Sequence, residues 1–174
     1  MCIRDRLLVD RPLHAFATIG GTAALTTATN LNTPSSAGCT LLVDCSSNDG
    51  AIIDSLSIIA NEAVTTASNV IVFISTATTS ANITTANTVA VAMGGITSVA
   101  KGDRTNISLP PLTVPVPNLA SPAATMAAYP TETDKKNTGL YVPSSALVYV
   151  GVDAALTAPS ANTRVHVFAQ GGFF

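Results

Sequence analysis

The amino-acid sequence predicts an all-β fold: a single-domain β-sandwich or jelly roll of about eight short strands. Three observations support this prediction. Short β-prone segments recur from Phe16 onward, turn residues separate them about every ten residues, and threonine, whose branched Cβ suits a pleated surface, is abundant. The length of 174 residues fits one domain, which we place at residues 13–174.

The first half of the chain contains two predicted strands joined by a turn. Residues 39–46 alternate, which places Cys39, Leu41, Val43 and Cys45 on one face. The Asp-Gly pair within residues 48–50 is a strong hairpin signal. Residues 52–60 match a strand, with Ile52, Asp54, Leu56, Ile58 and Ala60 on one side, and also a helical stripe. The turn and the β-rich neighbours favour the strand.

The middle of the chain adds two more segments. Residues 69–76 contain a continuous apolar run rich in β-branched residues, which indicates a strand buried on both faces. Residues 88–93 alternate, and we expect Gly94 and Gly95 to end this strand.

The last third contains a proline-rich segment, a long loop and two predicted strands. Residues 106–117 are extended but hold four prolines, which indicates an edge or bulged strand. Residues 119–139 are predicted to be one long loop, either an arm that reaches a neighbouring subunit or a surface insertion. Residues 140–153 and 164–170 are predicted strands, and residues 165, 167 and 169 of the second share one face.

The charge content excludes two classes of protein. Only 10% of the residues are charged, 47% are apolar, and the net charge is −2. Such a chain has no basic patch for nucleic acid and too many apolar residues for intrinsic disorder. It also has no apolar run of about 18 residues, so no membrane span is predicted. A surface of hydroxyls and amides suits a protein that packs against copies of itself or a partner.

The N-terminal segment, residues 1–12, differs from the rest of the chain. It contains three of the eight basic residues and is unlike a secretory signal. Its first six residues, MCIRDR, resemble the translated sequencing adapter that begins many metagenomic gene models. We therefore expect residues 1–6 to be non-native and assign them no function. The alternative is an ordinary charged N-terminal arm.

The three cysteines do not indicate a disulfide framework. Cys39 and Cys45 flank a predicted strand, so their Cα atoms would lie about 20 Å apart, far beyond the roughly 7 Å that a disulfide allows. Cys2 lies too near the terminus to judge. We expect Cys39 and Cys45 to be small buried residues.

No catalytic, cofactor-binding or metal-binding residue is predicted. The sequence holds no nucleophile elbow, P-loop or dinucleotide fingerprint. The two histidines, His14 and His166, could join Cys39 and Cys45 in a zinc site, but the close spacing that makes such a signal specific is missing. We expect the glycine pairs at 20–21, 94–95 and 171–172 to be turns and bulges.

The C-terminal third carries a family resemblance. Residues 140–152, LYVPSSALVYVGV, and 164–174, RVHVFAQGGFF, resemble the C-terminus of small virion proteins of tailed bacteriophages. That group has "L-P-x-G-x-L-x-V", a Thr- or Ala-rich loop, and a final "V-x-A-x-G-G" followed by Asp and an aromatic residue. Here Phe173 stands where Asp is usual. Residues 53–58 and 69–74 also resemble the central hairpin of the group, so the resemblance covers residues 16–174.

The resemblance implies a non-enzymatic structural protein of the virion, a capsid decoration (cement) subunit. Its expected partners are the major capsid protein or other virion proteins and copies of itself, with a trimer favoured. It would be assembled in the host cytoplasm, without nucleic acid, membrane or cofactor. The candidate subunit-contact residues are Pro111, Pro115, Pro117, Met126, Tyr129, Phe173 and Phe174.

Two other classes remain open. A secreted carbohydrate-binding module would need two or three exposed aromatic residues on one face, and the chain has three Tyr and five Phe. A cell-surface filament subunit would be expected to carry a signal peptide. An enzyme is the weakest of the alternatives.

Overall fold

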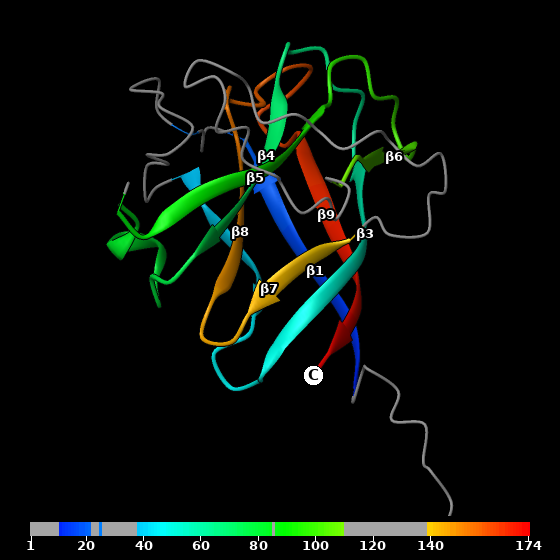
Figure 1. The fold of residues 1–174 in the computed structure, drawn as a ribbon. Coiled ribbons are helices and arrows are strands. Elements are labelled where there is room, and N and C mark those ends of the chain that lie inside the picture. The colour runs from blue at the N-terminus through cyan, green and yellow to red at the C-terminus, as the bar shows by residue number, and fades with distance from the viewer. Residues whose placement is uncertain (1–10, 22–24, 26–37, 85, 110–138) are drawn as a thin grey trace, which may run out of the picture.

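In the computed structural model, two antiparallel β-sheets pack face to face as a β-sandwich (Figure 1). The structure describes residues 11–21, 25, 38–84, 86–109 and 139–174. The predicted all-β sandwich is confirmed, with nine strands in the described residues instead of about eight. None of the helices described is long and apolar enough to span a membrane.

The first sheet has five strands in the spatial order β1, β9, β3, with β6 and β7 both on the far edge of β3. Every pairing in it is antiparallel. The strands are β1 (Arg11–Gly20), β9 (Arg164–Phe173), β3 (Gly50–Ala60), β6 (Arg104–Ile107) and β7 (Leu140–Pro143).

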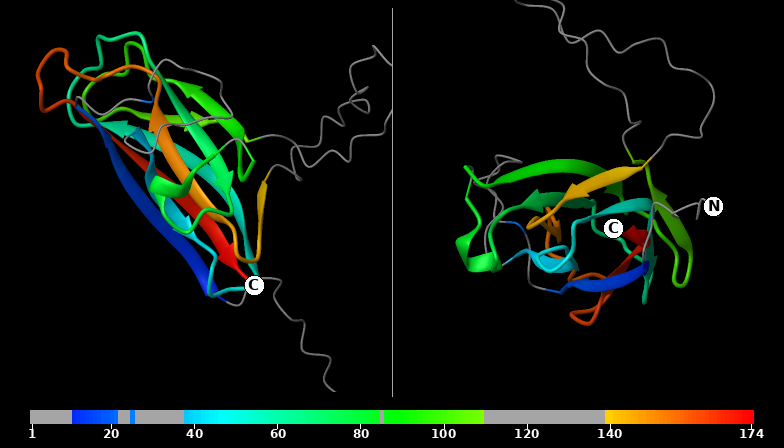
Figure 2. Two further views of the ribbon diagram at one scale, coloured as in Figure 1. Left: turned by 90° about the vertical axis from the view of Figure 1, so that its left-hand side faces the viewer. Right: turned by 60° about the horizontal axis from the view of Figure 1, so that its bottom comes forward.

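The second sheet has four strands in the order β2, β8, β4, β5, also antiparallel. These are β2 (Thr40–Asp44), β8 (Leu147–Val152), β4 (Asn69–Ser75) and β5 (Thr88–Gly95). Figure 2 shows the chain from two further sides, with β1, β9 and β3 in one layer and β8 and β4 in the other.

The main core lies between the two sheets and follows the pleat of the strands. In β9, Val165, Val167 and Ala169 are buried while the residues between them point outward, which confirms the predicted alternation. In β4, Val70 and Val72 face this core. Residues 70–73 are all buried, which confirms the prediction of a strand covered on both faces.

A second apolar cluster covers the outer face of the four-stranded sheet. Ile71 and Phe73 of β4 pack there with residues from the neighbouring strand and loops. The hydroxyl of Tyr149 donates a hydrogen bond of 3.0 Å to the carbonyl oxygen of Ala77, so its polar end is satisfied inside the cluster. The cluster consists of Leu25, Cys39, Ile71, Phe73, Ala77, Ile83, Leu147 and Tyr149.

Two β-bulges correct the predicted strand faces. In β3, the register shifts between Ile53 and Ser55, so Ile52 and Asp54 do not share a face with Leu56. In β2, the register shifts between Leu41 and Val43, and Leu41 is exposed. Each bulge inserts one residue and reverses the inside–outside phase beyond it. The alternating sequence pattern does not reveal where a bulge inserts a residue.

The predicted hairpin at residues 48–50 is wrong. The strands on either side of this turn, β2 and β3, belong to different sheets, so the turn crosses the sandwich. Gly50 has φ 133°, a conformation that glycine adopts without strain. The Asp-Gly pair indicated the turn correctly but could not show which strands it joins.

Three predicted strand boundaries also change. Residues 140–153 are two strands, β7 and β8, in opposite sheets, and the turn between them has Ser145 at φ 65°. Gly94 and Gly95 do not break the strand after Met93 but are the last two residues of β5 and pair with Val70 and Asn69 of β4. The edge strand predicted at 106–117 is β6, at Arg104–Ile107, and the remainder from residue 110 lies outside the described residues.

The chain start of the sandwich also differs from the prediction. β1 begins at Arg11, two residues before the predicted domain boundary, and pairs along its whole length with β9. Residues 1–10 lie outside the described residues.

Cys39 and Cys45 are free and buried, as predicted. Burial raises the pKa of Cys39 to about 12, and burial together with the nearby Asp44 carboxylate raises the pKa of Cys45 to about 11. Both are therefore neutral thiols at pH 7 and act as small apolar residues.

Candidate functional site

The outer face of the five-stranded sheet is open, and its side chains form cross-strand rows. The pairings of β1, β9, β3 and β6 place Phe16, Phe168, Ser57 and Asn106 side by side in one row. The two neighbouring rows are polar at most positions. Directly opposed residues on one face of a sheet contact each other, so the register alone assembles this surface from four separate strands.

The centre of this face is aromatic. The Phe16 ring is 68% exposed, and its centroid lies 6.1 Å from that of Phe168 at an angle of 33°. Ile59 of β3 is half-buried and lies in the neighbouring row, opposite His166. An exposed phenylalanine of this kind leaves one ring face free for a ligand or a partner.

Polar side chains fix the rows on either side. The Oγ1 of Thr18 and the Nδ1 of His166 are 2.9 Å apart, and the Oγ of Ser55 donates a hydrogen bond of 3.3 Å to the Oε1 of Gln170. These bonds join neighbouring strands and hold the two rows beside the phenylalanines.

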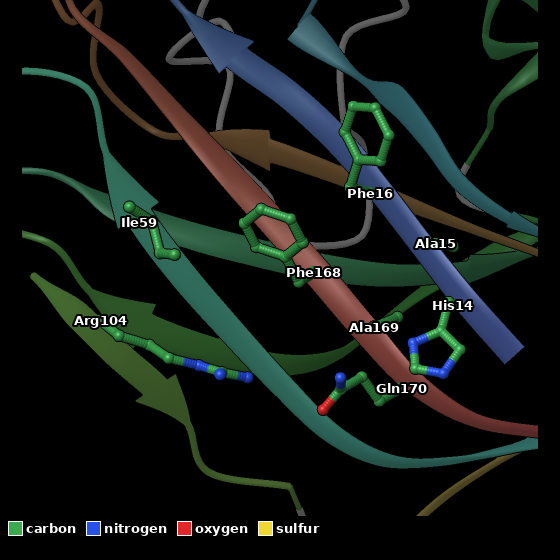
Figure 3. A pocket seen from close by; sticks show the side chains of 8 residues that line it. All are labelled: His14, Ala15, Phe16, Ile59, Arg104, Phe168, Ala169 and Gln170. Carbon is green, nitrogen blue, oxygen red and sulfur yellow. The ribbon is translucent and has the colours of Figure 1, made fainter. Parts of the chain in front are cut away.

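A hollow of about 340 Å³ lies over this surface (Figure 3). In Figure 3, Arg104 of β6 and Gln170 of β9 point toward each other across β3, Phe168 lies above both, and His14 lies beside Gln170. The lining contains one guanidinium, one imidazole and one amide, but no carboxylate. Its residues are His14, Ala15, Phe16, Ile59, Arg104, Phe168, Ala169 and Gln170.

Ser57 is a buried polar residue in the same cross-strand row as Phe168. It is 1% exposed, and its Oγ has no hydrogen-bond partner among the described residues. An unpaired buried hydroxyl costs about 1–3 kcal/mol. Ser57 lies on the outward side of β3 but is covered there by its larger neighbours.

Two short strands, β6 and β7, share the far edge of the sheet, with a gap between them along β3. β6 pairs with Leu56–Ile59 of β3, and β7 pairs with Gly50–Ile53, both antiparallel. The chain therefore leaves this edge after Ile107 and returns to it at Leu140, on either side of the β3 bulge at Asp54. A second hollow, of about 420 Å³, lies at this interruption and is lined by Asp54, Ser55, Leu56, Asn106, Ile107, Ser108 and Leu109.

A second aromatic group lies where the C-terminus meets β7. The ring of Tyr141, 51% exposed, is 6.0 Å from that of Phe174. The Arg11 guanidinium lies 5.5 Å from the centroid of the Phe173 ring and also bonds to the side chain of Asn48. Phe173 itself packs against the main core. We name Tyr141 and Phe174 the C-terminal aromatic patch.

The predicted contact residues divide into two groups. Phe174 lies in the C-terminal aromatic patch, and Phe173 packs against the main core beside Arg11. The role of both in subunit contact stays a prediction. The other five, Pro111, Pro115, Pro117, Met126 and Tyr129, lie outside the described residues, as does most of the predicted loop at 119–139.

The four residues of the possible zinc site, His14, His166, Cys39 and Cys45, lie in different parts of the sandwich. His14 and His166 lie on the outer face of the five-stranded sheet, while Cys39 and Cys45 belong to different apolar clusters. Within the described ranges, no group of three or more His, Cys, Asp or Glu residues is placed to hold a metal ion.

The carboxylate of Asp153 holds the loop after β8 in place through hydrogen bonds. The Asp153 carboxylate accepts hydrogen bonds from the Ser68 hydroxyl at 2.9 Å and from the backbone and side-chain nitrogens of Asn69, both at 2.7 Å. Desolvation raises the pKa of Asp153, but these hydrogen bonds outweigh it and lower the pKa below its usual value. All its bonds go to the chain itself, so Asp153 is a structural group.

Sequence reasoning missed Phe16, Arg104 and Gln170 as members of one surface. The signal for Phe16 is present, because Leu13, Ala17 and Ile19 alternate with outward residues in β1. Arg104 is far from the others in the chain, and only the β3–β6 register brings it to the same face. Comparison with protein-family models, curated proteins and solved structures finds no match for this chain.

Proposed function

We propose that the protein is a non-enzymatic structural subunit of a tailed-phage virion, a decoration subunit that binds the major capsid protein and copies of itself, with a trimer favoured. One observation of the structure supports this most: the edge of the five-stranded sheet is interrupted between β6 and β7, beside the C-terminal aromatic patch. The sequence resemblance of residues 140–152 and 164–174 to small virion proteins names the class of assembly.

The interrupted edge suits a contact between subunits. Ile107 at the end of β6 pairs with Leu56 of β3, and Leu140 at the start of β7 pairs with Ile53 of the same strand, so β3 holds both sides of the interruption. Tyr141, exposed on β7, lies next to the point of return. Exposed aromatic rings beside polar groups are common in protein–protein contacts.

Small contacts of this kind gain strength on a lattice. A subunit held at several points binds with an effective concentration that raises its overall affinity without any new contact. The low charge of the chain, 10% of residues, also weakens repulsion between copies.

The first experiment measures whether the chain belongs to a particle. Tailed particles would be purified from the material that carries the gene, and quantitative mass spectrometry would give the copy number of the chain relative to the major capsid protein. We expect a fixed ratio that persists through density-gradient purification. Presence of the chain only in the cell or in the particle-free fraction would contradict the proposal.

A second experiment tests the contact surface with the full chain. Light scattering after size exclusion should give three times the mass of one chain, and Tyr141→Ser should lower that mass. Val89→Ser on β5 is the matched control, because Val89 and Tyr141 are both 51% exposed. A monomer at all concentrations would contradict self-association, and an equal effect of both variants would contradict the assigned surface.

A further inference from the structure

We propose that the hollow on the outer face of the five-stranded sheet binds a saccharide that carries a carboxylate. This site is separate from the C-terminal aromatic patch and the interrupted edge, so it does not depend on the proposed virion function. Its chemistry follows from four properties of the described residues: an apolar platform, a polar rim, an excess of positive charge and a fixed geometry.

The apolar platform is the pair Phe16 and Phe168. The free face of the 68% exposed Phe16 ring has a negative quadrupole, which attracts the weakly positive C–H groups of a sugar ring. Phe168, tilted by 33° to Phe16, forms a shallow corner with it. One apolar face of a puckered pyranose fits such a corner, whereas a planar base is better held between parallel rings.

The polar rim comes from three strands. His14 of β1, Gln170 of β9 and Arg104 of β6 all line the hollow and lie on one side of the phenylalanines (Figure 3). Imidazole, amide and guanidinium groups bond to hydroxyls and carboxylates at the edge of a sugar. A few converging polar groups around an apolar floor are typical of ligand sites, and about 340 Å³ is within their usual size.

The charge of the face favours an anion. Arg104 is exposed, and none of the described residues forms an ion pair or side-chain hydrogen bond with it. The other cationic or titratable groups on this face are His14, His166 and Arg164. The acidic residues at its borders are Asp103, which precedes Arg104, Asp54 in the second hollow, and Glu62, which bonds to Thr163 next to Arg164. A guanidinium binds a carboxylate through two parallel hydrogen bonds.

The site is fixed before any ligand arrives. Its residues stand on four paired strands, and Gln170 is already held by the Ser55 hydroxyl. Rigid polar groups lose little entropy on binding. Ser57, whose buried Oγ has no partner among the described residues, lies in the same row between Phe168 and Asn106.

Calorimetric titration of the full chain tests the proposal. The probe is a galacturonate tetrasaccharide, and the comparison ligand is the same tetrasaccharide with its carboxyls reduced to alcohols. We expect a Kd between about 10 µM and 1 mM for the acidic probe, and at least about tenfold weaker binding of the reduced one, because the ion pair with Arg104 is lost.

Three variants locate the site. Phe16→Ala and Arg104→Gln should each weaken binding of the acidic probe about tenfold or more, and Arg104→Lys should recover part of the loss by restoring the charge. Val89→Ala, an exposed substitution on the other sheet, should leave Kd unchanged. Unfolding midpoints equal to that of the wild type show that the variants are folded.

Several results would overturn the proposal. These are absence of binding at millimolar probe, equal binding of the acidic and reduced tetrasaccharides, and unchanged binding by both Phe16→Ala and Arg104→Gln. Binding of an acidic peptide or a nucleotide at this face without binding of the tetrasaccharide would assign the hollow to another ligand class.

Discussion

The two sheets of the sandwich differ in what lies on their outer faces. In the four-stranded sheet the central strands β4 and β8 are buried on both sides, because the main core covers one face and the cluster around Phe73 and Tyr149 covers the other. Its edge strands β2 and β5 still expose single apolar side chains, namely Leu41, Val89 and Met93. The five-stranded sheet is buried only toward the core, and its other face exposes Phe16, Arg104 and Gln170. The covered sheet therefore contributes mainly to stability, and the open sheet is the surface available for binding.

The sequence already carries this difference. The β4 segment of the covered sheet is a continuous apolar run, whereas the β9 segment of the open sheet alternates between apolar and polar residues. A strand that is buried on both faces has no need for alternation. The pattern of each strand thus indicates which sheet is covered.

The largest expected effect is on the covered sheet. Phe73→Ala removes a ring that is 1% exposed inside the outer cluster, and we expect it to lower the free energy of unfolding by about 3–5 kcal/mol. Urea denaturation followed by circular dichroism measures the change. A loss below about 1 kcal/mol would mean that the outer cluster adds little stability and that the two sheets are alike.

The next effect compares two glycines, one in each sheet. A Cβ at Gly171 of β9 would lie 2.9 Å from the carbonyl carbon of Ile52 and from the Cα of Ile53, and would overlap the Ile52 carbonyl oxygen. Gly171→Ala must therefore force the β3 bulge apart, and we expect a loss of about 2–4 kcal/mol. At Gly95 of β5 the nearest atom is 3.7 Å away, so Gly95→Ala is the control and should change stability by less than about 0.5 kcal/mol. Equal denaturation midpoints for the two variants would contradict the close approach at the bulge.

A smaller effect concerns the loop after β8 in the covered sheet. The folded pKa of Asp153 is lower than its unfolded value of about 3.9, so its stabilisation is present above that pH and is lost as pH falls through the folded pKa. We expect Asp153→Asn to cost about 1 kcal/mol at pH 7, since charge-assisted hydrogen bonds become neutral in a partly exposed site. The difference between wild type and variant should shrink as the pH falls below the unfolded pKa and through the lower folded pKa of Asp153. A difference that is constant with pH would show that the carboxylate charge plays no part.

The strands could be predicted from the sequence better than their arrangement. The alternation of β9 and the apolar run of β4 carry their own burial patterns, so both were predicted correctly. The bulges at Asp54 and Leu42 could not be foreseen, because a bulge depends on the partner strand and not on local periodicity. The turn at Gly50 and the turn at Ser145 were visible, but the sheets they connect were not.

The open face was the part least accessible from the sequence. Phe16, Phe168 and Arg104 are distant along the chain, and they share one face only because β1, β9, β3 and β6 pair in a particular register. Each residue alone is an ordinary exposed strand residue. Their combination depends on long-range pairing, which no short motif records.

The division between a covered sheet and an open sheet is tested most directly by Phe16→Ala, measured for stability and for binding in the same preparation. Because the ring is 68% exposed, the variant should keep the wild-type free energy of unfolding within about 0.5 kcal/mol and should bind the galacturonate tetrasaccharide about tenfold more weakly. A loss of stability above about 1 kcal/mol, or unchanged binding, would contradict the assignment of this face to binding.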